Sequence, residues 1–312
     1  AMATEVSDGL YIGGLAALQE IQEHGIGAVV TLGYPPATPS TSACVDVLAL
    51  EVEDDDDSDI LDAVLKSGPF LAAARARGVA ALVACHAGVS RSATLVCAEL
   101  MRSRGIGVEE ALAALRERHP CAAPNDGFLE QLQLFADMGC ALRVSHAGYR
   151  AHRLQQHGVR WARTGEVEAA SGPGAEGSSP CSPSSFSAAE REEALGGGEL
   201  RCGKCRRLLA LGALHVVPHD PPADGSKAKR FAGKKGAKAA AGDACTSVFL
   251  EPLAWMGGIA EGEAEGKLVC PNPKCAARLG SFNWAGTQCS CGAWVNPAFQ
   301  LPLSKVDFMR AS

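Results

Sequence analysis

The chain has 312 residues, 47% of them hydrophobic, so it is long enough for two domains with at least one sizeable core. Its formal net charge of -6 excludes a protein that coats nucleic acid over its whole surface. No apolar run approaches the roughly 20 residues that span a bilayer, and the beginning of the chain lacks the layout of a secretory signal. We therefore expect a soluble intracellular protein.

The first half of the chain alternates strand-like and helix-like segments. Short apolar runs predict strands over 9–14, 27–33, 45–52 and 79–85. Helical patterns lie between them over 15–25 and 59–78, and three amphipathic helices follow over 91–105, 108–119 and 125–139. Strands that alternate with helices predict an α/β domain with a largely parallel central sheet.

The composition changes twice in the second half. A stretch rich in Gly, Ser, Pro and Ala around 164–198 predicts a flexible linker, because it cannot bury enough apolar surface to offset its ordering entropy. Short apolar runs between cysteine-containing turns then predict a small β domain stapled by metal. The predicted domains are residues 5–160, a linker over 161–199, and a zinc-binding β domain over 200–312 with a basic loop at 225–242.

The segment "ALVACHAGVSRSAT" places Cys85 and Arg91 between a predicted strand and a predicted helix. Backbone N–H groups of such a loop point inward and meet the positive end of the helix dipole, which makes a cradle for a phosphate dianion. The same field favours the thiolate of Cys85, and the planar guanidinium of Arg91 can hold two phosphate oxygens. The predicted phosphate-binding residues are His86, Ala87, Gly88, Val89, Ser90 and Arg91. The alternative is an ordinary strand-to-helix turn that happens to contain a cysteine.

These residues resemble the Cys-x5-Arg signature of protein tyrosine and dual-specificity phosphatases. The resemblance implies that Cys85 attacks phosphorus, that water hydrolyses the phosphocysteine, and that Ser92 assists release of the thiolate, with no cofactor. It also implies an upstream aspartate as general acid, for which Asp54 in "EVEDDDDSD" is the best match and Asp55 the fallback. Asp56 and Asp57 are interpreted as solvated. Asn125 in "HPCAAPNDGF" would support the loop and cap the next helix.

The sequence departs from this signature at Ala84, where the family has a histidine directly before the cysteine. That histidine supports the cysteine loop by hydrogen bonding. Its absence predicts a less stabilised thiolate and slower turnover, with phosphate binding largely intact. We expect Ala84→His to raise activity.

The last part of the chain contains seven cysteines that form three close pairs and one single residue. Their spacing predicts two structural tetrahedral zinc sites, which need eight ligands. His219 is the preferred eighth ligand and His215 the alternative. The thiols are Cys202, Cys205, Cys245, Cys270, Cys275, Cys289 and Cys291.

Two pairings of these ligands are possible. One joins Cys202 and Cys205 with Cys270 and Cys275, and leaves His219 with the remaining three cysteines. The other makes a local ribbon from the last four cysteines of the chain. The resemblance of "LVCPNPKC" after a distant Cys-x2-Cys to small zinc β domains of the Mss-four type favours the first.

The order of phosphatase segment, linker and cysteine-rich segment resembles the zinc-containing dual-specificity phosphatases of eukaryotes. This implies phosphoprotein substrates, a role in maturation of the large ribosomal subunit, no membrane association, and movement between nucleus and cytoplasm. The basic loop could contact ribosomal RNA or a pre-60S particle, or it could be a solvated loop. Its cations are Lys227, Lys229, Arg230, Lys234, Lys235 and Lys238. A competing hypothesis is a ribosome-assembly binding factor whose phosphatase site is weak because of Ala84.

Overall fold

The computed structural model describes residues 2–33, 45–167, 197–219, 245–257, 259 and 262–309. It divides into two compact units, Ala1–Leu142 and Arg143–Ser312. The predicted basic loop 225–242 and most of the predicted linker 161–199 lie outside the described residues. No helix among the described residues is long and apolar enough to cross a membrane.

The first unit is built on a five-stranded sheet in the order β1-β2-β5-β3-β4. Strands β2, β5, β3 and β4 run parallel, and β1 pairs antiparallel with β2 at one edge. The α/β fold with a largely parallel sheet is therefore confirmed. The strands are β1 (Thr4–Ser7), β2 (Leu10–Gly13), β3 (Ile26–Gly33), β4 (Asp46–Glu51) and β5 (Ala80–Ala84).

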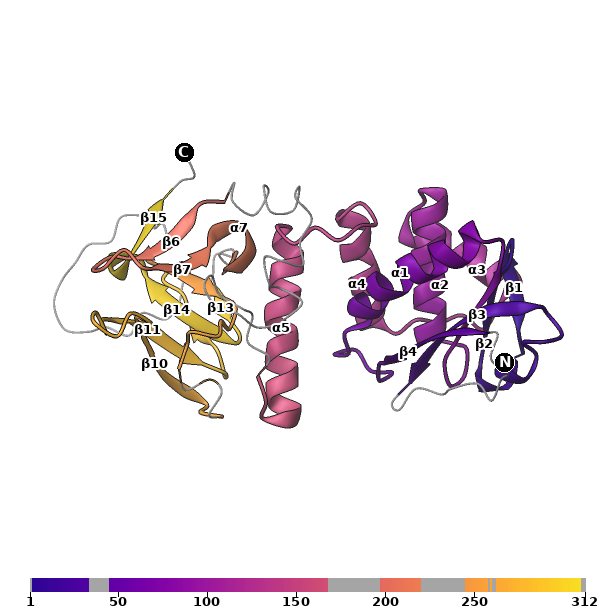
Figure 1. Ribbon diagram of the computed structural model, residues 1–312, viewed down its shortest axis with the longest axis horizontal. Helices are drawn as coiled ribbons and strands as arrows, with labels where there is room; N and C mark the ends of the chain where they lie inside the picture. Colours follow the sequence, from indigo (N-terminus) through magenta and orange to yellow (C-terminus); the bar gives the residue numbers. More distant parts are fainter. Residues whose placement is uncertain are drawn as a thin grey trace. The chain divides into compact units, whose positions relative to one another are not determined.

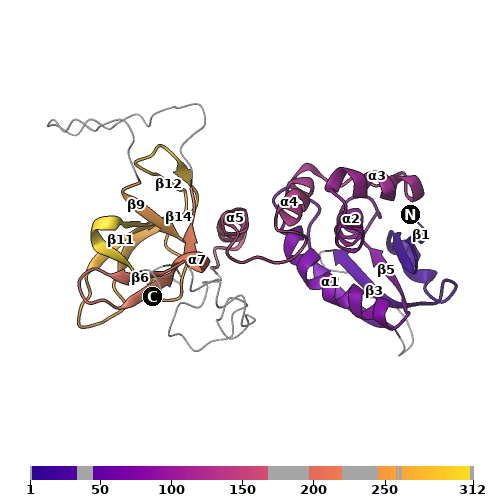
Figure 2. The ribbon, with the colours of Figure 1, turned by 90° about the horizontal axis from the view of Figure 1, so that it is seen from above.

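Helices cover one face of this sheet (Figures 1 and 2). Helices α1 and α2 pack against β5 and against each other, and α3 and α4 pack against α2. The ion pair of buried Glu99 with Arg75 links α2 to α1, and Arg102 of α2 pairs with the same carboxylate. The helices are α1 (Ile60–Ala76), α2 (Arg91–Arg104), α3 (Val108–Arg118) and α4 (Asp126–Asp137).

The predicted helix over 15–25 is shorter than expected. The structure has a 3-10 helix, η1 (Leu15–Gln19), followed by turns. The Ile26 N–H donates to the Ile21 carbonyl at 2.9 Å, so the chain closes on itself and enters β3 directly. The η1 segment covers the side of β5 that carries Leu82 and Ala84, where they join the apolar cluster with Ala17 and Ile21.

The described residues of the second unit form one long helix, a short one and three small sheets. Helix α5 (Ala147–Thr164) precedes strands that form sheets in the orders β15-β6-β7, β10-β11-β14-β9-β8 and β12-β13. The elements are β6 (Glu199–Cys202), β7 (Leu208–Leu211), α7 (Gly212–His215), β8 (Val216–Val217), β9 (Ser247–Leu250), β10 (Glu265–Val269), β11 (Arg278–Asn283), β12 (Thr287–Gln288), β13 (Trp294–Val295), β14 (Ala298–Pro302), η2 (Leu303–Lys305) and β15 (Val306–Met309).

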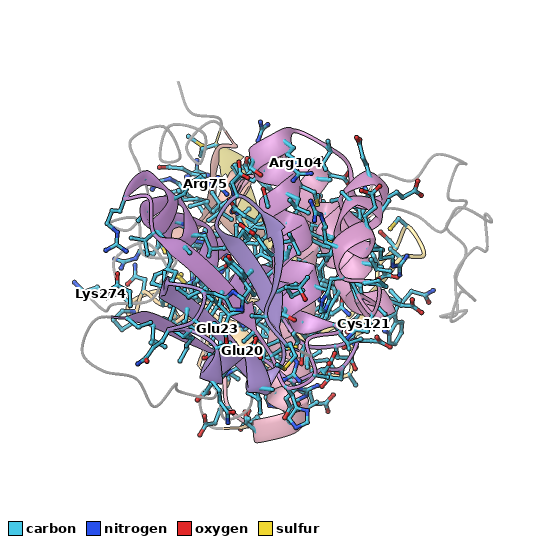
Figure 3. The ribbon with its side chains drawn as sticks, turned by 90° about the vertical axis from the view of Figure 1, so that its right-hand side faces the viewer. Glu20, Glu23, Arg75, Arg104, Cys121 and Lys274 are labelled. Atoms are coloured by element: carbon cyan, nitrogen blue, oxygen red, sulfur yellow. The ribbon has the colours of Figure 1, made fainter. Side chains whose placement is uncertain are left out.

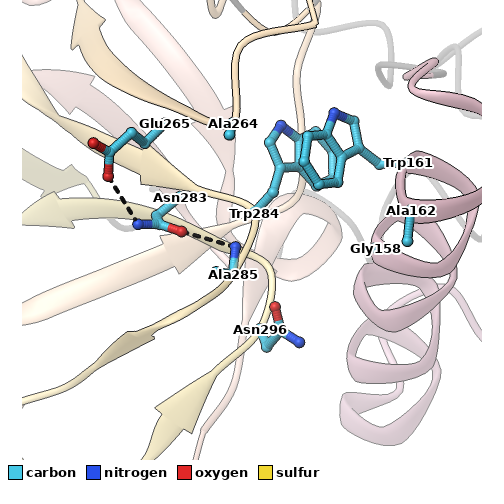
Figure 4. Close-up of a pocket in the computed structure, with 9 residues that line it drawn as sticks. All are labelled: Gly158, Trp161, Ala162, Ala264, Glu265, Asn283, Trp284, Ala285 and Asn296. Atoms are coloured by element: carbon cyan, nitrogen blue, oxygen red, sulfur yellow. Dashed lines mark hydrogen bonds between the residues drawn. The ribbon is translucent and has the colours of Figure 1, made fainter.

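Helix α5 belongs to the second unit, although residues up to 160 were predicted to end the first domain. Its Leu154 is part of the same buried core as Phe249. Its Trp161 stacks on Trp284 with ring centroids 5.1 Å apart and planes 2° apart (Figure 4). A short sheet domain leaves one face uncovered, and the apolar stripe of an amphipathic helix buries that face. The structure therefore places residues 143–160 in the second unit.

Candidate active site and cysteine clusters

Cys85 follows the last residue of β5 and lies at the base of a loop that leads into α2. Its side chain is buried, and its Sγ accepts a hydrogen bond from the Gly88 N–H at 3.2 Å. The Ser92 hydroxyl lies 3.2 Å from the same sulfur. A backbone N–H and a hydroxyl that both face one sulfur stabilise its anionic form, because hydrogen bonds to a charged group are strong.

Gly88 has a backbone conformation that only glycine adopts readily. Its φ is +79°, and a Cβ there would lie 2.7 Å from the Gly13 carbonyl carbon and 2.8 Å from the Gly14 nitrogen. The loop therefore passes close to the end of β2, and a side chain at this position would force the two backbones apart. This close approach lets the loop curl tightly around the sulfur.

Arg91 is the first residue of α2, and its guanidinium contacts the segment that follows β4. Its terminal nitrogen donates to the Val52 carbonyl at 3.0 Å, and its Nε lies 3.5 Å from an Asp54 carboxylate oxygen. Among the described residues this buried Nε has no hydrogen-bond partner. A phosphate oxygen would satisfy the donor, which fits the predicted role of Arg91 as a clamp.

Asp54 is held at the site from two sides. It faces Arg91, and the Asn125 side-chain amide donates to its other carboxylate oxygen at 3.3 Å. Asn125 also caps α4, because its Oδ1 accepts the Phe128 N–H at 2.8 Å, and its own N–H donates to Ser90 at 3.3 Å. The structure thus brings the predicted acid, cap and phosphate loop together.

The other acidic residues of this loop accept backbone N–H groups, two of them from residues nearby in the chain. The Asp55 carboxylate accepts the Asp57 N–H at 3.0 Å, and Asp59 caps α1 through the Asp62 N–H at 3.0 Å. Asp56 accepts the Gly127 N–H at 3.4 Å. The 3.5 Å contact of the Asp54 carboxylate with Arg91 favours Asp54 over the fallback Asp55 as the acid.

The cysteines of the second unit gather into two groups of four ligands. Cys202, Cys205, Cys270 and Cys275 form one, and His219, Cys245, Cys289 and Cys291 form the other, with all ligand atoms of each group within 4.8 Å of one another. The sulfurs of Cys205 and Cys270 are 3.5 Å apart, and His219 Nε2 lies 3.0 Å from the Cys289 sulfur. Tetrahedral ligands at about 2.3 Å from a zinc ion lie about 3.8 Å apart, so each group can hold a metal ion.

Known proteins resemble this chain over the first unit and over nearly its whole length. The model of the dual specificity phosphatase catalytic domain matches residues 10–138. Dual specificity protein phosphatase 12 of mouse is 37% identical over 322 residues, which cover 99% of this chain and 89% of the mouse protein. The tyrosine-protein phosphatase yvh1 of fission yeast is 33% identical over 98% of this chain and 85% of its own length. The chain belongs to the dual specificity protein phosphatase 12 family.

A further relative matches part of the chain. A probable inactive dual specificity protein phosphatase-like protein of Arabidopsis thaliana is 50% identical over 107 residues, 34% of this chain and 71% of that protein. Membership of the dual specificity protein phosphatase 12 family confirms the predicted resemblance and the predicted class of enzyme. The favoured pairing of metal ligands agrees with the two groups, and the local ribbon of four cysteines does not form.

Ala84 lies where the family has a histidine, and its methyl group packs against apolar side chains. The Ala84 side chain is 1% exposed and packs with Leu82, Ala17 and Ile21. A histidine there would have to displace these side chains, and overfilling a packed core costs about 1–3 kcal/mol. The expectation that Ala84→His simply restores activity therefore neglects the tight packing around the methyl group.

A different histidine contacts the loop, and the sequence analysis missed it. His119 follows α3, is 3% exposed, and places its Nε2 2.8 Å from the Gly88 carbonyl oxygen. The dipeptide His119-Pro120 lies shortly before Asn125 in the sequence. This proximity to a predicted site residue was the one sequence feature that could have pointed to His119. Spacing alone does not reveal the contact, because it depends on how α3 and α4 pack on α2.

His215, the alternative metal ligand, belongs to a separate buried polar group. Its Nδ1 accepts the Leu211 N–H at 3.0 Å, and its Nε2 lies 3.8 Å from Glu251. Burial, together with nearby Arg153, lowers the pKa of His215 to about 4, so the imidazole is neutral. His219 is the ligand that reaches the cysteines.

Proposed function

We propose that this chain hydrolyses phosphotyrosine and phosphoserine or phosphothreonine in proteins through a phosphocysteine intermediate on Cys85. The observation that carries the proposal is the convergence on one sulfur of the Gly88 N–H and the Ser92 hydroxyl, beside the Arg91 guanidinium. Such an arrangement binds a phosphate dianion and presents a nucleophile to its phosphorus atom.

The proposed reaction has two steps. The Cys85 thiolate attacks phosphorus while Asp54 gives its proton to the departing oxygen of the substrate, so the alcohol or phenol leaves neutral. In the second step, Asp54 accepts a proton from water, which attacks phosphorus and releases inorganic phosphate. Ser92, 3.2 Å from the sulfur, donates to the thiolate as it departs. The two steps need no metal ion.

The two cysteine groups are proposed to hold zinc. Each offers four soft or borderline ligands, and sites with three or four thiolates and no open position are structural. Bound zinc would supply folding energy to a unit whose sheets are short. Its role is thus the stability of the second unit and not phosphoryl transfer.

The test of the phosphatase proposal uses the intact chain and two phosphate esters, p-nitrophenyl phosphate and a phosphoserine peptide. We expect Cys85→Ser to lose activity on both by about 10⁴-fold or more. Asp54→Asn should lose about 10²-fold or more on the phosphoserine peptide and less on p-nitrophenyl phosphate, because a good leaving group needs less protonation. Asp57→Asn is the matched control. Equal activity of Cys85→Ser and the unmutated chain would reject the proposal.

A second function is supported by two observations. Ala84 removes the imidazole that precedes the nucleophile in the phosphatase signature, which supports a weakened phosphatase site. The resemblance of the whole chain to the zinc-containing dual-specificity phosphatases supports a binding role in assembly of the large ribosomal subunit. We propose this role beside the enzymatic one, together with movement between nucleus and cytoplasm. Co-sedimentation with pre-60S particles tests it: Cys202→Ser should release the chain from the particles and Cys85→Ser should not. No co-sedimentation of the unmutated chain would reject it.

A further inference from the structure

The carbonyl groups of the Cys85 loop point outward and are held there by three donors. The Leu15 N–H donates to the His86 carbonyl at 3.2 Å, and the Ala123 N–H donates to the Val89 carbonyl at 2.9 Å. The third carbonyl, that of Gly88, faces His119 Nε2 at 2.8 Å. Two of the three donors are backbone groups, and the third is a side chain.

Outward carbonyls fix the direction of the inward N–H groups. A trans peptide is planar, so its N–H points away from its C=O. Holding the Gly88 carbonyl outward therefore turns the Val89 N–H toward the cradle. The same reasoning applies to the Ala87 and Ser90 N–H groups, whose peptides are held by Leu15 and Ala123. The cradle for phosphate depends on these outer hydrogen bonds.

The Gly88–Val89 peptide has the greatest need of an anchor. Gly88 lies at φ +79°, and because it has no Cβ, its φ and its ψ can both reach values that are closed to other residues. A peptide next to a glycine can therefore turn over at low cost unless a hydrogen bond holds its carbonyl. If it turned, a carbonyl oxygen would face the phosphate in place of an N–H and would repel it.

The hydrogen-bond partners of His119 determine its protonated nitrogen. The Gly88 carbonyl can only accept, so Nε2 carries the hydrogen, and Nδ1 lies 3.4 Å from the Thr4 hydroxyl, which can donate to it. The exposed thiol of Cys121 lies 3.1 Å from the same Nε2 (Cys121 is labelled in Figure 3). The thiol is a weak acceptor and shares the Nε2 hydrogen with the carbonyl.

We propose that His119 is a positioning residue that holds the Gly88–Val89 peptide and thereby supplies, from the segment after α3, the loop support that Ala84 cannot give. This inference rests on the proposed phosphatase function. It predicts that the imidazole acts on the loop only as a hydrogen-bond donor, through Nε2. A non-titrating side chain with an N–H near the position of Nε2 should then replace it, and glutamine is the closest such residue.

The test is calorimetric titration of inorganic phosphate into the Cys85→Ser chain with and without a second substitution. In this background no hydrolysis occurs, so phosphate binding can be measured whether or not the chain is a phosphatase. We expect His119→Ala to weaken binding about tenfold, the cost of one buried hydrogen bond, and His119→Gln to recover most of the loss. His24→Ala is the control and should bind as the parent does.

The binding constant and the stoichiometry separate two roles. A residue that only stabilises the fold would lower the fraction of chain that binds phosphate and leave the dissociation constant of the folded fraction unchanged. Binding of His119→Ala within about twofold of the parent, or a loss that His119→Gln does not recover, would overturn the inference. Hydrolysis rates of chains that retain Cys85 show whether binding, turnover or both are affected. His119→Ala should raise KM and lower kcat, and His119→Gln should leave the pH profile unchanged.

Discussion

The two units hold their functional groups in different ways. In the first, the cradle is contiguous in sequence, and backbone groups such as Leu15 and Ala123 fix it from both sides. In the second, each metal group joins segments that are far apart in the chain, as with Cys205 and Cys270, which are 65 residues apart. The backbone of the chain thus holds the first site, whereas a metal ion bound by the second would hold distant segments together.

The two sites also differ in the protonation of their cysteines. Burial raises the pKa of Cys270 and of Cys245 to about 12, and neighbouring thiols add to the shift. A metal ion reverses this by binding the thiolates and releasing their protons. Bound cations would therefore stabilise the arrangement of the second unit, whereas the cradle of the first unit is built around the single thiol of Cys85.

The largest difference between the two units is expected when metal is removed. All four tryptophans, Trp161, Trp255, Trp284 and Trp294, lie in the second unit, so their fluorescence reports on that unit alone. We expect a strong chelator to unfold the second unit, since each structural zinc ion contributes on the order of 10 kcal/mol, while hydrolysis of p-nitrophenyl phosphate persists. Unchanged tryptophan emission after complete metal removal would contradict the comparison.

A smaller effect is expected from the ion pair that ties α5 to the second unit. Arg153 lies 2.8 Å from Glu251, whose side chain is 4% exposed. Arg153→Met removes a positive charge that compensates this buried carboxylate. It should lower the free energy of unfolding by about 3 kcal/mol, measured by urea unfolding followed by tryptophan emission. Adding Glu251→Gln should recover part of the loss. If the double variant is no more stable than the single one, the ion pair is not what holds the helix.

Acid should weaken the second unit through His215. Its pKa falls from 6.5 to about 4 on folding, so the unfolded chain binds a proton that the folded one refuses, and stability drops as pH falls from 6.5 toward 4. The full difference corresponds to about 3 kcal/mol, and Glu251, whose pKa burial raises, contributes with the opposite sign. His215→Asn keeps an acceptor for the Leu211 N–H but cannot titrate. Its stability should change less between pH 7 and pH 5, and an equal change would exclude His215 as the cause.

The smallest predicted effect concerns Ala84. We expect Ala84→His to cost about 1–3 kcal/mol of first-unit stability, because the imidazole must displace Leu82 or Ala17. Since His119 already contacts the loop, activity should not rise. Heat-inactivation rates and kcat/KM measured on the same samples would show both. A more active variant of unchanged stability would show that the loop lacked support after all.

The sequence was sufficient for features that local patterns determine. The spacing of Cys85 and Arg91 between a strand and a helix predicted a cradle, and the α/β order predicted the parallel sheet. The pairing of the metal ligands followed from resemblance and not from spacing, which allowed two arrangements. These signals work because helix ends and strand ends fix the direction of nearby backbone groups.

Features set by packing between distant elements were not predictable in the same way. The role of α5 in the second unit depends on which surface covers its apolar stripe, and its amphipathic pattern does not say which. His119 and Gly88 are separated by 31 residues, and only the packing of α3 and α4 brings them together. The predicted helix over 15–25 was too long because the turn between Ile21 and Ile26 has no strong sequence signal.

The central claim is that Cys85 is the nucleophile of a preformed cradle. The most direct measurement is rapid acid quenching of the chain during turnover of p-nitrophenyl phosphate, followed by mass spectrometry of its peptides. The account predicts one phosphoryl group on the peptide that contains Cys85, and none in Cys85→Ser or when phosphate ester is omitted. Steady hydrolysis by the unmutated chain without any phosphorylated Cys85 peptide, or label on another cysteine, would contradict it.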